Sequence, residues 1–257
     1  MSSGFTYILC AAPGQTRDAA GFGLTMAHMG WQLGDGMRLE SIGVGPSMRG
    51  GYMIIGDAMY DGKAGDASRL ADACLRECGL RSFEGVVFDF EQRTSKHLEA
   101  FIAEAAPYLE KHSLSVSVPE RYAGAYSGTQ VLVPSAMTSG SLRSRLSEAR
   151  QRYGPRVALE IECLRRDILL PGPQSAGMPL HREELAELLS ERGGAKFYSQ
   201  EMCAHYFTYK DAKGSTHFVL FDDASSLRSK AQTALRFGID RGFILYPEAE
   251  GFLQALV

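Results

Sequence analysis

The sequence lacks the features that mark export, membrane insertion or nucleic-acid binding. Residues 1–14, MSSGFTYILCAAPG, have no basic segment ahead of their short apolar run, so they do not resemble a secretory signal. No apolar run approaches the roughly 20 residues of a membrane span. The net charge of the 257 residues is −3, so no positive field attracts nucleic acid. We expect no membrane span, no nucleic-acid partner and a cytoplasmic location, with spore association left open.

Common cofactor and catalytic motifs are also missing. The chain has no GxSxG, HExxH or P-loop sequence, and its six histidines show no metal-ligand spacing. The glycine pairs at 21–23 and 43–45 lack the third glycine of a dinucleotide fingerprint. We therefore expect neither a cofactor nor a metal site.

The five cysteines are scattered and odd in number, which is typical of a chain in a reducing compartment. Cys74 and Cys78 lie four residues apart in a helical pattern and so share one helix face. A zinc or redox pair usually shows closer CxxC spacing, so we expect buried packing thiols here.

Apolar segments alternate with amphipathic ones along most of the chain. The expected strands are residues 6–13, 51–60, 83–91, 114–120, 129–137, 156–164, 217–223 and 241–247. The expected helices are residues 66–79, 95–112, 141–154, 181–194 and 225–239, with Asp66 as the first N-cap.

This alternation predicts a parallel sheet with crossover helices. Seven or eight strands favour an α/β fold of the TIM (β/α)8 barrel type, with an open doubly wound sheet as the alternative. No linker divides the chain, so we expect one domain, 1–257, with a small hairpin-like insertion at 205–223 before the last long helix. We assign no strand or helix within the glycine-rich residues 14–50.

The strand at 83–91 ends in two acids. Side chains alternate along a strand, so Val86, Phe88 and Phe90 form the row expected to face the helices. Asp89 and Glu91 share the opposite row, roughly 7 Å apart along the backbone and facing the barrel interior. They would lie at the C-terminal end of the strand, where TIM-barrel active sites are built.

Other acids follow the same pattern. Glu160 and Glu162 share the inward row of the strand at 156–164, and Asp57 ends the strand at 51–57. Buried carboxylates are costly without partners, so their convergence indicates a site. For Glu160 and Glu162, pairing with Arg or Lys remains an equal alternative.

The segment EGVVFDFE (84–91) resembles the DGxDxDxE signature of the family 18 glycoside hydrolases, the chitinase-like family. It is more similar still to the DGVNIDFE form in bacterial spore-germination and cortex-lytic N-acetylglucosaminidases. Gly85, Asp89 and Glu91 match. Residues 205–246 resemble the ending of that subgroup, with a Y-x-D-x-x-G turn and an Asp-Ala-x-Ser step into a helix.

The resemblance implies a TIM barrel with its acids after strand four and a substrate-assisted retaining mechanism. It implies that Glu91 is the general acid and that Asp89 orients the 2-acetamido group of the substrate. A neighbouring carboxylate in a dry pocket would raise the pKa of the acid, as this role requires. Tyr246 occupies the position of the barrel-floor Trp and is expected to stack on a sugar.

Three further positions depart from the family pattern. Glu84 replaces the first Asp, and Val87 replaces a polar residue beneath Asp89. Ser139 stands where a Tyr would hold the acetamide carbonyl. Losing two supporting groups would cost several kcal/mol of transition-state stabilisation.

The leading hypothesis is a glycosidase that cleaves β-linked N-acetylhexosamine glycans, such as peptidoglycan, spore cortex or a chitin-like polymer. The alternative is a catalytically inactive barrel that binds glycan or has a structural role. A third hypothesis is unrelated chemistry at Glu160 and Glu162. The expected partner is an oligosaccharide or cell-wall glycan, and the oligomeric state is left open.

Overall fold

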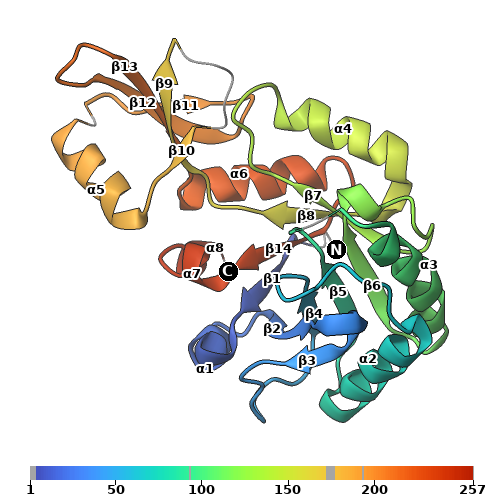
Figure 1. Ribbon diagram of the computed structural model, residues 1–257. Coiled ribbons are helices and arrows are strands. Elements are labelled where there is room, and N and C mark those ends of the chain that lie inside the picture. Colours follow the sequence, from blue (N-terminus) through green and yellow to red (C-terminus); the bar gives the residue numbers. More distant parts are fainter. Residues whose placement is uncertain (1–3, 93, 172–176, 193, 257) are drawn as a thin grey trace.

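The computed structural model describes residues 4–92, 94–171, 177–192 and 194–256. Its main sheet closes into a parallel barrel, because the first strand pairs with both the second and the last (Figure 1). The strands in ring order are β1 (Thr6–Ala11), β14 (Arg241–Leu245), β8 (Val157–Ile161), β7 (Gln130–Pro134), β6 (Ser115–Pro119), β5 (Gly85–Asp89), β4 (Tyr52–Gly56) and β2 (Thr25–Leu33). The predicted TIM barrel is confirmed, and β5 is its fourth strand in chain order.

Helices surround the barrel where the sequence pattern placed them (Figure 1). They are α2 (Ala67–Arg81), α3 (Lys96–Lys111), α4 (Leu142–Tyr153) and α6 (Ala224–Leu235), with short helices α1 (Thr16–Ala20), α7 (Tyr246–Ala249) and α8 (Leu253–Leu256). Asp66 caps α2 by accepting a hydrogen bond of 2.9 Å from the backbone N–H of Arg69. Among the described residues, no helix has the length and apolar character needed to cross a membrane.

Residues 14–50 contain the barrel strand that the sequence left unassigned. This strand, β2, is nine residues long, and its pairing with β4 is interrupted by a register shift between His28 and Trp31. The irregularity breaks the alternation of side chains that reveals a strand in a sequence. A short antiparallel strand, β3 (Leu39–Ser41), pairs with the end of β2.

The two rows of β5 face as predicted. Val86, Phe88 and Phe90 pack in the hydrophobic cluster that also contains Leu98 and Phe101 of α3. On the inward row, Val87 belongs to the small cluster that fills the barrel. All five cysteines, which lie in the described part of the chain, are buried and outside disulfides, as expected for packing thiols.

The insertion is larger than the predicted hairpin. The hairpin itself is confirmed as β12 (Ala204–Lys210) paired with β13 (Thr216–Phe221). It lies within a five-stranded antiparallel sheet of order β10-β9-β13-β12-β11, at the upper left of Figure 1. The added strands are β9 (Arg165–Leu170), β10 (Met178–Pro179) and β11 (Phe197–Ser199). The expected helix at 181–194 is α5 (Arg182–Glu191), whose Leu185 packs on this sheet.

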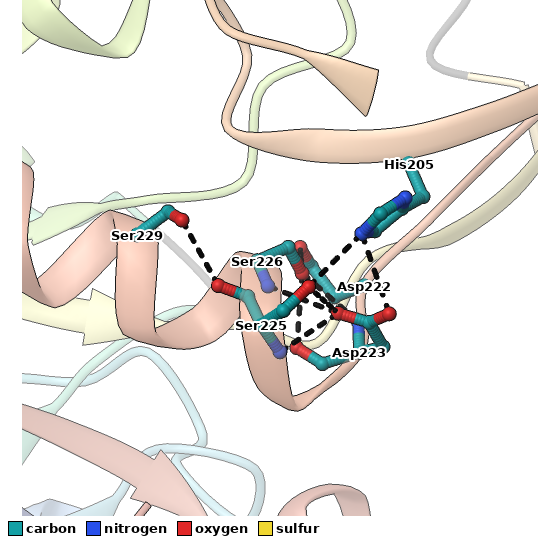
Figure 2. A network of polar contacts seen from close by, with 6 residues as sticks. All are labelled: His205, Asp222, Asp223, Ser225, Ser226 and Ser229. Carbon is teal, nitrogen blue, oxygen red and sulfur yellow. Dashed lines mark hydrogen bonds and ion pairs between the residues drawn. The ribbon is translucent and has the colours of Figure 1, made fainter. Parts of the chain in front are cut away.

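Two adjacent acids join this sheet to the barrel. Asp223 caps α6 by accepting from the backbone N–H groups of Ser225 and Ser226, and it lies 3.3 Å from His205 of β12 (Figure 2). Asp222, in contrast, is buried and pairs with buried Lys230. It also accepts hydrogen bonds of 2.8 Å from the Leu164 backbone and 2.7 Å from the Ser226 hydroxyl. Asp223 thus caps α6, whereas Asp222 forms a buried ion pair.

Removing the Asp222 carboxylate is expected to destabilise the protein strongly. In Asp222→Ala, the Lys230 ammonium stays buried without its partner, which costs about 3–5 kcal/mol. Chemical denaturation followed by circular dichroism measures the free energy of unfolding. The matched control is Asp223→Ala, which removes a partly exposed cap and should cost about 1 kcal/mol. Equal losses in the two variants would contradict the role given to the buried pair.

Candidate active site at the barrel mouth

A pocket of about 330 Å³ opens at the C-terminal ends of the barrel strands. Its floor is apolar and includes Val87, Leu132 and Phe243, which belong to the cluster inside the barrel. Its walls carry carboxylates: Asp89, Glu91, Glu160, Glu162 and Glu248. A second pocket, of about 370 Å³, shares three of these acids and extends to Arg121. The two pockets form a groove between the ends of β5 and β8.

Asp89 is the last residue of β5, and its side chain is mostly buried. Burial and the nearby charges of Glu91 and Asp57 raise the pKa of Asp89 to about 6. Glu91 lies two residues beyond the strand, with 39% of its side chain exposed. The structure therefore brings the predicted pair together at one pocket.

Asp57 acts from behind the pocket and does not line it. Its side chain is buried, and one oxygen accepts hydrogen bonds from the backbone N–H groups of Glu91 (3.1 Å) and Gln92 (3.0 Å). The carboxylate of Asp57, which directly follows β4, thus fixes the path of the chain as it leaves β5. Asp57 was expected to line the mouth of the barrel. Instead, it lies behind the pocket and orients Glu91.

Arg121 holds Glu91 from the opposite side. It lies in the short helix η3 (Glu120–Tyr122) and donates 2.6 Å to the Glu91 carboxylate and 3.0 Å to the Glu91 carbonyl. This segment is fixed in turn, because Glu120 pairs with Arg145 of α4. Arg121 was not predicted from the sequence. No local pattern marked it, because Arg121 lies in η3, beyond the end of β6, where the two-residue period of the strand no longer applies.

Glu160 and Glu162 also meet at the groove, but their surroundings differ. Glu162 accepts a hydrogen bond of 3.3 Å from Arg166. Glu160 is largely buried, and burial, followed by the charges of Glu91 and Asp89, raises its pKa to about 7. Within the described residues, no hydrogen-bond donor or cation lies in bonding distance of the Glu160 carboxylate. Glu160 and Glu162 therefore lie together at the groove, as predicted. The alternative, pairing with Arg or Lys, holds for Glu162 and not for Glu160.

Two expected sugar contacts lie outside the groove. Tyr246 begins α7, is buried in the outer cluster beside Phe22, and donates a hydrogen bond of 2.8 Å to Glu250. Alternation along β14 instead turns Leu245 toward the pocket. Ser139 is exposed in the loop after β7, and it lines neither pocket. No tyrosine of the described residues lines either pocket.

No group of acidic, histidine or cysteine side chains in the described part of the chain is arranged to hold a metal ion. The groove therefore consists of an apolar floor, mutually repelling carboxylates and one arginine engaged with Glu91. Such a site can exchange protons and can hydrogen-bond a polar, uncharged ligand.

No protein-family model and no curated protein sequence matches the chain. Solved structures do match. The chitinase of Chromobacterium violaceum ATCC 12472 has a TM-score of 0.72 at 16% identity, covering 98% of each chain. The spore cortex-lytic enzyme SleL of Bacillus megaterium QM B1551 has a TM-score of 0.70 at 14% identity, covering 99% of this chain and 74% of SleL.

A GH18 chitinase from Cycas revoluta, in complex with (GlcNAc)3, has a TM-score of 0.63 at 12% identity, covering 98% of this chain and 97% of that one. The chain has the fold of the GH18 chitinases. The resemblance read from EGVVFDFE is thereby confirmed at the level of the fold.

Loss of the Asp57 acceptor is expected to loosen the segment that carries Glu91. In Asp57→Ala, two backbone N–H groups lose an acceptor, which costs about 1–3 kcal/mol. Asp57→Asn removes the same charge but keeps an acceptor oxygen, so it should lose less stability. Denaturant unfolding of both variants isolates the hydrogen-bonding contribution. An Asp57→Ala protein as stable as Asp57→Asn would contradict it.

Asp89 is expected to make the protein less stable as pH rises. Its pKa of about 6 in the folded state lies above the usual 3.8, so the folded state keeps the proton to higher pH. The contribution of Asp89 to the free energy of unfolding is fully present below about pH 4 and is lost as the pH rises through about 6. Asp89→Asn should therefore be more stable than the parent at pH 7.5, by an amount on the order of 2–3 kcal/mol, and nearly equal to it at pH 4.

Urea unfolding at the two pH values measures this difference. The free energy of unfolding should still fall with rising pH in Asp89→Asn, but less steeply than in the parent. The remaining fall is expected because Glu160 contributes in the same direction. An unchanged slope would show that Asp89 does not titrate in this range.

Proposed function

We propose that the chain is a glycoside hydrolase that cleaves β-linked N-acetylhexosamine glycans, such as peptidoglycan, spore cortex or a chitin-like polymer. The observation that carries this proposal is the position of Asp89 and Glu91, side by side at the pocket where β5 ends. The pocket volume lies in the range of small-molecule sites. The similar structures include a spore cortex-lytic enzyme and a chitinase in complex with (GlcNAc)3, which supports this substrate class.

In the proposed reaction, Glu91 gives its proton to the glycosidic oxygen as the bond from that oxygen to the anomeric carbon breaks. The acetamide oxygen of the same sugar attacks the anomeric carbon and forms a cyclic, positively charged intermediate. Asp89 orients the acetamide N–H and balances the charge. Water then opens the intermediate and returns a proton to Glu91, so the configuration is retained.

Arg121 sets a condition on this reaction. A general acid must carry a proton, whereas the 2.6 Å contact between Arg121 and Glu91 is the contact of an ionised carboxylate. Glycan entry therefore has to displace Arg121 from the carboxylate, leaving its second contact with the Glu91 carbonyl. The pair is over one-third exposed on both sides, and exposed pairs are worth only about 0–1 kcal/mol, so this displacement is cheap.

A second candidate is a catalytically inactive barrel that binds glycan. Two observations favour it. Arg121 occupies the carboxylate that would act as the acid, and no tyrosine among the described residues reaches the pocket. This candidate requires glycan binding without turnover.

Glu91→Gln is the test that separates the two candidates. If Glu91 is the general acid, hydrolysis of chito-oligosaccharides or cortex fragments should fall about 10²–10⁴-fold, while binding remains. Reducing-end assays and calorimetry measure the two quantities. The control is Glu187→Gln, on the exposed face of α5, which should hydrolyse at the parent rate.

Unchanged hydrolysis in Glu91→Gln would reject the mechanism. Binding by the parent protein without any turnover would instead support the inactive barrel.

A further inference from the structure

Glu160 occupies the layer of the barrel nearest its mouth. Pro119 of β6 pairs with Leu132 of β7, and Leu132 pairs with Ala158 of β8, so these residues share one layer. Glu160 lies two residues beyond Ala158 on the same inward row. Its side chain lines both pockets of the groove, as does that of Glu91. A ligand in either pocket therefore contacts both strand ends.

Three of the other acids at the groove are each held by a donor, whereas Asp89, like Glu160, has none among the described residues. Glu91 is bonded to Arg121, and Glu162 is bonded to Arg166. Glu248 accepts a hydrogen bond of 3.0 Å from the backbone of Cys163. For the Glu160 carboxylate, the described residues provide no such donor.

The groups that face Glu160 are almost all acidic or neutral. Asp89 and Glu91 approach it from β5, and Glu162 lies on its own chain segment. The Cys10 thiol faces it from β1, and the cation that reaches it is Arg121, which is already bonded to Glu91. An ionised Glu160 would thus be buried among like charges, which favours the protonated form. Its pKa of about 7 agrees with this reading of the geometry.

We propose that Glu160 binds the glycan as a neutral carboxylic acid and donates a hydrogen bond to the acetamide carbonyl of the bound sugar. The inference rests on the proposed function insofar as it takes an N-acetylhexosamine glycan as the ligand. An ionised carboxylate only accepts hydrogen bonds, whereas a protonated one has a hydroxyl to donate. The acetamide carbonyl has no proton and needs a donor, and the ionised acids of the groove offer none.

This role also has a consequence for the reaction. The acetamide oxygen gains positive character as it attacks the anomeric carbon, so its orientation must be set beforehand. A donor held on the rigid strand β8 fixes that orientation without adding a negative charge beside Glu91. Glu160 would then be a substrate-positioning group whose protonation limits binding at high pH.

The test is the affinity for (GlcNAc)3 at pH 6.0 and 8.5, measured by calorimetry. To keep turnover out of the measurement, the ligand is supplied as its thio-linked analogue, and the parent and both variants retain Glu91, whose charge contributes to the raised pKa of Glu160. The parent should lose affinity about 30-fold at pH 8.5, because the protonated fraction falls roughly tenfold for each pH unit above 7. Glu160→Gln, a donor at every pH, should lose most of this dependence and keep only the part that Asp89, with a pKa of about 6, contributes. Glu160→Leu, of similar size without a donor, should bind weakly at both values.

Circular dichroism and unfolding midpoints establish that each variant is folded. A pH dependence in Glu160→Gln equal to that of the parent would overturn the inference, since another group would then titrate. Parent-like affinity in Glu160→Leu, or no binding of (GlcNAc)3 by the parent, would overturn it as well.

The outcomes separate this inference from the proposed function. If hydrolysis depends on Glu91 but Glu160→Leu binds as the parent does, the proposed hydrolase activity is supported and the proposed role of Glu160 is rejected. Binding that depends on Glu160 without any hydrolysis by the chain that retains Glu91 supports Glu160 and rejects the hydrolase.

Discussion

Repulsion among carboxylates at the end of an apolar barrel is the interaction on which this site depends. The floor of the pocket is hydrophobic, so it supplies no polar group to screen the charges above it. The pKa of Asp89 and that of Glu160 rise for the same reason, burial reinforced by neighbouring acids. Cations are supplied selectively, to Glu91 by Arg121 and to Glu162 by Arg166. The distribution of partners, and not the number of acids, gives each carboxyl a different chemical state.

The rest of the fold holds these groups in place. Asp57 fixes the backbone at Glu91 through two N–H groups, and the pairing of Glu120 with Arg145 fixes the segment of Arg121. The insertion is attached beside the groove through Asp222, whose carboxylate connects the end of β13 to Leu164 and to Lys230 of α6. Each of these contacts links residues more than seven positions apart. The geometry of the site therefore depends on the closed barrel as a whole.

Much of the barrel could be predicted from the sequence. Alternation along β5 correctly separated Phe88, which packs on α3, from Asp89, which faces the pocket. The long helices were visible from their apolar spacing and from caps such as Asp66. The strand β2 was missed because its register shift disrupts the alternation. The strand β9 was missed because its charged start, Arg165–Asp167, does not resemble a strand until β13 pairs with it.

Side-chain direction beyond a strand end was the least predictable feature. Tyr246 and Ser139 were assigned by their resemblance to family positions at strand ends, but the first belongs to α7 and the second to an exposed loop. Once a strand ends, its two-residue period no longer decides where a side chain points. The partners of Glu91 and Glu160 depend on segments far away in sequence, for which no local pattern exists.

The sequence by itself determined the barrel and the placing of Asp89 and Glu91 on the inward side of β5, because both follow from local periodicity. Only the tertiary structure decided which acid is paired and which is left without a partner. Charge interactions act through space, between β5, β8 and η3, and these elements come together only when the barrel closes.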